Sequence, residues 1–144
     1  MYARILLPTD GSDITAKAVA TAVQLAAKVG AEVAALAVKE PFPYSAITEM
    51  QPVPPQEFYD SQERIALKHL QAVKDACAAA SVACTAASVE ALHPWEAILD
   101  FGKSQGCDLI VMASHGRRGV AALLLGSETQ KVLTHSTVPV LVVR

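Results

Sequence analysis

One stretch decides the fold: Leu109-Ile110-Val111-Met112-Ala113-Ser114-His115-Gly116, from which nine further residues lead to Gly126-Ser127. Its first four residues are apolar and predict a buried strand, and a helical pattern begins near Ser127. Glycines between a buried strand and a helix N-terminus let backbone N–H groups approach an anion closely, and the helix dipole favours negative charge there. The stretch therefore predicts a turn that binds phosphate.

The bulk composition narrows the class of protein. A chain of 144 residues is long enough for one domain with a core, so we expect residues 1–144 to form a single domain. The net charge is −2 with no basic block, which argues against a nucleic-acid partner. Neither a signal peptide nor a membrane-spanning segment is recognisable, so we expect a cytoplasmic protein without a membrane partner.

Apolar runs and helical periods alternate along the chain. Apolar runs predict strands at 5–7, 33–38, 83–89, 109–112 and 138–143. Helices are expected from a cap at Ser12 or Asp13 to about Val29, then over 57–80, from Pro94 to Gly106 and over 127–136. In the second helix, one apolar face is expected to consist of Ala66, Leu70, Val73 and Cys77.

The alternation of strand and helix predicts an α/β fold with one parallel sheet covered by helices on both faces. In such folds ligands lie beyond the carboxyl ends of the strands, where the strand order reverses. These ends are Pro8-Thr9-Asp10, Val38, Val89 and Met112-Ala113. The glycine-containing turn directly follows one of them, so the motif and the architecture point to the same place.

Four segments carry a family resemblance: Ile5-Leu6-Leu7-Pro8-Thr9-Asp10-Gly11-Ser12, residues 108–117, Leu124-Leu125-Gly126-Ser127 and Val138-Pro139-Val140-Leu141-Val142-Val143. In order and spacing they resemble universal stress proteins over the whole chain. The resemblance implies a doubly wound, Rossmann-like sheet of five parallel strands, similar to the adenine nucleotide alpha hydrolases. Numbered along the chain, its strand order would be 3-2-1-4-5.

The nucleotide-binding branch of that family carries the motif G-x2-G-x9-G-[S/T], and members with the full motif bind ATP. Here Gly116, Gly126 and Ser127 match the last three elements, whereas Ala113 stands in place of the first glycine. If φ is positive at Ala113, the methyl group costs about 1 kcal/mol of strain. If φ is negative, the methyl group only narrows the pocket.

The resemblance implies ATP as the ligand and assigns roles along the motif. The backbone of Val38 would bind the adenine edge, and Met112 and Ala113 would line the ribose. Asp10 would face the ribose or adenine, or hold a hydrated Mg²⁺ or Mn²⁺ against the phosphates, and its alternative role is to cap the local turn. The complete set of expected nucleotide-binding residues is Pro8, Thr9, Asp10, Val38, Met112, Ala113, Gly116, Arg117, Arg118, Gly126, Ser127, Glu128 and Thr129.

The phosphates would be bound by the backbone N–H groups of Gly116 and Gly126 and by the Ser127 hydroxyl, as the resemblance implies. One of Arg117 and Arg118 would neutralise phosphate charge. The N–H groups of Glu128 and Thr129 would reach the γ-phosphate, although the Glu128 carboxylate is an unfavourable charge beside it.

Three functions follow from these residues. The leading hypothesis is an ATP-binding stress-response switch or sensor. The alternatives are an interaction protein that binds no nucleotide, with Ala113 marking a lost ribose site, and a slow ATPase. We assign no catalytic residues, because the chain has no G-x-S-x-G elbow and no Walker A lysine, and no metal-ligand set. The apolar edge strand Val138–Val143 predicts a homodimer.

Overall fold

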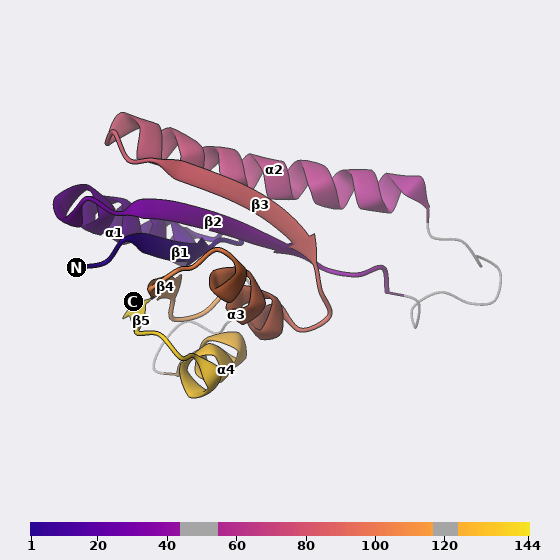
Figure 1. Cartoon of the computed structure of the whole chain (residues 1–144). Helices are drawn as coiled ribbons and strands as arrows, with labels where there is room; N and C mark the ends of the chain where they lie inside the picture. Colours follow the sequence, from indigo (N-terminus) through magenta and orange to yellow (C-terminus); the bar gives the residue numbers. More distant parts are fainter. Residues whose placement is uncertain (44–54, 117–123) are drawn as a thin grey trace.

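Parallel strands form one sheet in the order β3-β2-β1-β4-β5 (Figure 1). The computed structural model describes residues 1–43, 55–116 and 124–144. The strands are β1 (Arg4–Pro8), β2 (Glu32–Lys39), β3 (Cys84–Glu90), β4 (Leu109–Ala113) and β5 (Val140–Val143). The helices are α1 (Asp13–Val29), α2 (Gln56–Ala79), α3 (Pro94–Ser104) and α4 (Ser127–His135). The predicted five-stranded parallel sheet and its strand order are confirmed.

The interiors of the central strands are apolar because helices cover both faces of the sheet. One face packs against α1 and α2, and the opposite face packs against α3 and α4 (Figure 1). Side chains alternate between the two cores, so that Ile5 and Leu7 enter the first core and Leu6 enters the second. All three are fully buried.

The helices begin within one residue of their predicted starts, and α3 ends at Ser104, two residues before the predicted Gly106. Ser12 caps α1, with its side chain accepting a hydrogen bond from the Thr15 N–H at 3.3 Å, and Gly30 ends it in the left-handed conformation. The buried residues of α2 are the four predicted from helical spacing. Within the described ranges, none of the helices combines the length and apolar character needed to cross a membrane.

The last strand is shorter than expected. It begins at Val140 and not at Val138. The Ser136 hydroxyl donates to the Val138 carbonyl at 2.7 Å and accepts from its N–H at 3.2 Å, which holds the chain in a turn. Pro139 has no N–H to donate to a ladder. Pairing with β4 therefore starts at Val140, opposite Ile110.

The cysteines are unpaired thiols placed in or beside the core. Cys77 is fully buried on α2, and burial raises the pKa of its thiol to about 12. Burial also raises the pKa of Cys84 and of Cys107. Since the thiolate is the reactive form, these cysteines are expected to be poor nucleophiles in the folded protein.

We predict that a thiol reagent such as Ellman's reagent leaves Cys77 unmodified at pH 8 while the protein is folded. In urea the same residue becomes reactive, because unfolding restores both access and an ordinary pKa. Peptide mapping of the labelled sites measures this directly. Rapid native labelling of Cys77 would contradict the buried position.

Candidate functional site

The strand order reverses between β1 and β4, which lie side by side in the sheet. The chain leaves β1 toward α1 on one face, whereas the helix that follows β4, α4, lies on the other (Figure 1). The segments beyond the two carboxyl ends therefore diverge, and this is the place where ligands bind in doubly wound folds. The glycine motif and Asp10 lie at this point, as the sequence predicted.

Of the two roles that the sequence left open for Asp10, the structure shows the capping of the local turn. Its Oδ1 atom accepts hydrogen bonds from the Ser12 N–H at 3.0 Å and from the Thr15 hydroxyl at 2.7 Å, so it does cap the turn into α1. Its Oδ2 atom lies against Gly116, where an added Cβ would stand only 2.6 Å away. The carboxylate thus lies between the segments that follow β1 and β4, and a Cβ at position 116 would require the Asp10 side chain or its surroundings to shift.

The two residues before Asp10 shape the turn from inside. Pro8 ends β1 opposite Leu36. Thr9 is buried, its N–H donates to the Leu36 carbonyl at 2.9 Å, and its hydroxyl accepts from the Gly11 N–H at 3.4 Å. The Thr9 side chain is therefore engaged in the turn itself.

Val38 presents backbone groups beyond the end of β1. The Leu36 carbonyl faces β1, since it accepts the Thr9 N–H. Alternate residues of a strand direct their N–H and C=O groups to the same neighbour, so those of Val38 also face the β1 side. The last pair between the two strands is Pro8 with Leu36, so the Val38 groups extend past the ladder.

Ala113 accommodates its methyl group without strain. It is the last residue of β4, pairs with Val143, and is not among the described non-glycine residues with positive φ. Its side chain packs in the core beneath α1, whereas Met112 packs in the opposite core. Of the two alternatives for Ala113, the structure shows negative φ, and the methyl group lies in the core.

The hydrogen-bond partner of the Gly126 N–H differs from the expected phosphate. It donates to the Ser114 carbonyl at 2.7 Å, so this N–H is already used within the protein. An added Cβ at Gly126 would lie 3.0 Å from the His115 Cα and 3.3 Å from the Ser114 oxygen. Gly126 therefore brings the start of α4 close to the end of β4, and the expected phosphate contact of its N–H is not available in this conformation.

The first turn of α4 is tied to its neighbours through side chains. Thr129 is buried, and its hydroxyl donates to the Ala113 carbonyl at 3.0 Å. The Glu128 carboxylate accepts the Trp95 N–H at 2.8 Å in the first turn of α3, so its charge is directed toward α3. Ser127 is exposed at the start of the helix. The first N–H groups of a helix lack partners within it, which makes this end suitable for an anion.

Two of the expected residues, Arg117 and Arg118, lie outside the residues that the structure describes. In the part that it does describe, no group of three or more His, Cys, Asp or Glu side chains is arranged to hold a metal ion. A shallow hollow of about 540 Å³ lies along α3, lined by residues that include Glu90, His93 and Asp100. No residue of the glycine motif lines this hollow.

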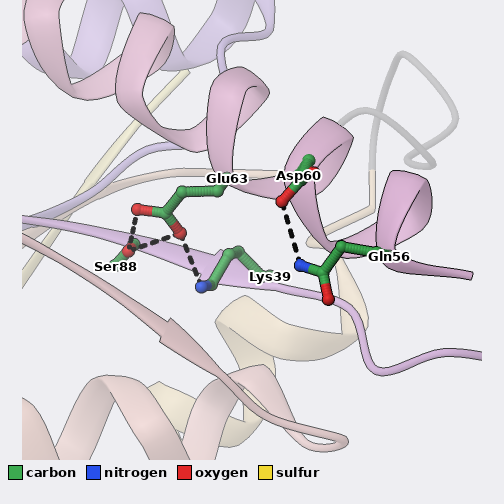
Figure 2. Close-up of polar contacts among 5 residues, drawn as sticks. All are labelled: Lys39, Gln56, Asp60, Glu63 and Ser88. Atoms are coloured by element: carbon green, nitrogen blue, oxygen red, sulfur yellow. Dashed lines mark hydrogen bonds and ion pairs between the residues drawn. The ribbon is translucent and has the colours of Figure 1, made fainter. Parts of the chain in front are cut away.

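Sequence reasoning missed two contacts of α2 with the carboxyl edge of the sheet. The His69 ring packs against Gly11, which has φ +73°, so closely that an added Cβ would stand 2.2 Å from its Nε2 atom. Glu63 binds Lys39 of β2 at 2.6 Å and accepts a hydrogen bond from Ser88 of β3 (Figure 2). These residues are far apart in the chain and form no motif, so the sequence carries no signal for either contact.

The hydrogen bond from Lys39 lowers the pKa of Glu63 below its ordinary value of 4.5, and Ser88 contributes in the same direction. Because the folded-state pKa is depressed, the stabilisation from this pair is present above the unfolded pKa. It is lost as the pH falls through the folded pKa. The contact is therefore intact at neutral pH.

A family model described as the universal stress protein family matches residues 1–144. The universal stress protein YxiE of Bacillus subtilis is 34% identical over 149 residues, covering 100% of both chains. The structure of MJ0577, a protein of Methanocaldococcus jannaschii, superposes with a TM-score of 0.83 at 28% identity, covering 99% of this chain and 96% of that one. A universal stress protein in complex with cAMP superposes with a TM-score of 0.73 at 26% identity, with 99% and 97% covered.

We predict that Thr129→Val destabilises the protein by about 1–3 kcal/mol, because the Ala113 carbonyl loses its buried donor. Thr134→Val is the matched control, since the Thr134 hydroxyl makes an exposed bond to the Gln130 carbonyl within the same helix. Urea denaturation of both variants measures the difference. Equal stabilities would show that the Thr129 bond does not hold α4 in place.

Proposed function

The chain belongs to the universal stress protein family, and on that premise we propose that it binds ATP in the crevice between β1 and β4 and acts as a nucleotide-dependent stress-response switch. The observation that carries the proposal is the packing of the Asp10 carboxylate against Gly116, where an added Cβ would be 2.6 Å from Oδ2. This contact brings an acidic side chain beside a glycine at the reversal of strand order. The complex of a related protein with cAMP supports an adenine nucleotide as the ligand.

In this proposal the Val38 backbone binds the adenine edge, and Met112 and Ala113 form the wall beside the ribose. The Ala113 methyl group packs in the core, which supports retention of the ribose site over the alternative that this residue marks its loss. Asp10 faces the ribose or a hydrated Mg²⁺ or Mn²⁺ beside the phosphates. Two donors bind its Oδ1 atom, and its Oδ2 atom lies beside Gly116.

The phosphates are assigned to the Gly116 N–H and to the first turn of α4, where Ser127, Glu128 and Thr129 present N–H groups. Hydrogen bonds to a charged partner contribute about 1.5–3 kcal/mol each, and the helix terminus adds roughly 0.3–1 kcal/mol. Three such contacts suffice for a dissociation constant in the micromolar range, about −8 kcal/mol. The Glu128 carboxylate is directed toward α3, where it accepts the Trp95 N–H.

We also propose that residues 1–144 act as one domain in the cytoplasm and that two copies associate through β5. This strand lies at the edge of the sheet, and Leu141 on it is 40% exposed. An apolar edge strand with unpaired backbone groups favours pairing with a second copy. Binding or release of the nucleotide beside β4 can then alter the dimer interface at β5, because β5 pairs directly with β4.

We predict that isothermal titration detects ATP binding to the wild-type protein and that Gly126→Val weakens it by about tenfold or more. The valine would displace the start of α4 from Ser114 and His115. Thr134→Val adds no bulk near the crevice and serves as the control. Absence of binding of ATP, ADP and AMP to the folded wild type would refute the proposed function.

We predict that light scattering gives the mass of a dimer and that Leu141→Lys shifts it toward the monomer, because the charge would be buried at the shared edge. Leu133→Lys is the control, since Leu133 on α4 has the same 40% exposure as Leu141. A monomeric wild type at micromolar concentration would contradict the proposed dimer, and so would equal effects of the two variants.

A further inference from the structure

A single carboxylate connects α2 to the ends of two strands (Figure 2). Glu63 Oε2 lies 2.6 Å from the Lys39 Nζ atom on β2. The Ser88 hydroxyl on β3 donates to both Glu63 oxygens, at 3.2 and 3.3 Å. Lys39 directly follows Val38, and Ser88 directly precedes Val89, the residue paired with Val38. Glu63 therefore connects β2 and β3 next to the Val38–Val89 pair, through the residue after Val38 and the residue before Val89.

The exposure of these groups argues against a mainly stabilising role. The side chains of Lys39 and Glu63 are 24% and 41% exposed, and ion pairs at such positions contribute little to global stability. Their effect is local, because they fix the end of β2 where the ladder with β1 has already ended. On the side of β3, the Lys39 carbonyl accepts a hydrogen bond at 3.1 Å from the N–H of Ala91, the residue that follows this strand. The backbone of Val38 is thus held from β3 and from α2.

The same helix also reaches the other half of the crevice. His69, six residues after Glu63, packs against Gly11 in the turn that carries Asp10. α2 therefore contacts the segment beside the expected adenine position and the segment beside the expected ribose position. A displacement of this helix would alter both.

We propose that Glu63 is a positioning residue for adenine recognition, which acts through Lys39 to hold the backbone N–H and C=O of Val38 at the base edge. The inference rests on the proposed function and extends it to a residue outside the motif. Glu63 does not contact the ligand in this account. Because Glu63 already restricts the Val38 backbone in the free protein, binding of the base costs less conformational entropy there.

The test compares two ligands that divide the nucleotide: adenosine, which carries the base and ribose, and inorganic tripolyphosphate, which carries only phosphates. Glu63→Ala is expected to weaken adenosine binding about fivefold and to change tripolyphosphate binding less than about twofold. Asp60→Ala is the matched control. Asp60 is exposed on the same helix, and its carboxylate accepts a hydrogen bond at 3.0 Å from Gln56, which also belongs to α2 (Figure 2). It is expected to leave both affinities unchanged.

A charge exchange separates positioning from general damage to the fold. In the double variant Lys39→Glu with Glu63→Lys, the ion pair is re-formed, and adenosine affinity is expected to return toward the wild-type value. Unchanged adenosine binding by Glu63→Ala would overturn the inference, and so would equal weakening of both ligands. Failure of the wild type to bind either ligand would instead refute the proposed function, and the inference with it.

Discussion

The reversal of strand order between β1 and β4 is the constraint on which the site depends. Because the chain continues from β1 to α1 on one face, and the helix after β4 lies on the other, the segments that follow the two carboxyl ends diverge. Asp10 connects them by binding the first turn of α1 through one oxygen and lying against Gly116 through the other. A side chain at position 116 would force the Asp10 carboxylate or the chain around residue 116 to shift.

Much of the fold could be predicted because its determinants are local. Neighbouring residues are enough to predict several elements. The apolar run Ile5–Leu7 indicates the first strand, and Ser12 and Gly30 mark the start and the end of α1. The strand at 138–143 was predicted two residues too long. Val138 and Pro139 continue the apolar run in the sequence, and only the hydrogen bond between the Ser136 hydroxyl and the Val138 carbonyl shows that they precede the strand.

The contacts of the candidate site residues could not be predicted in detail. Whether the Gly126 N–H points to a ligand or to the Ser114 carbonyl depends on how α4 docks onto β4, which no spacing encodes. The Glu128 carboxylate looked unfavourable beside phosphate, yet it binds the start of α3, 33 residues away in the chain. Glu63 and Lys39 meet across 24 residues, and only the placement of α2 on the sheet brings them together.

The central claim is that an adenine nucleotide lies between β1 and β4, with its base at Val38 and its phosphates at Gly116 and the start of α4. The most direct measurement is the change in backbone amide resonances when ATP is added to ¹⁵N-labelled protein. The account predicts that the largest changes occur at Val38, Gly116 and Ser127. Changes confined to the hollow along α3, around Glu90 and Asp100, would contradict it.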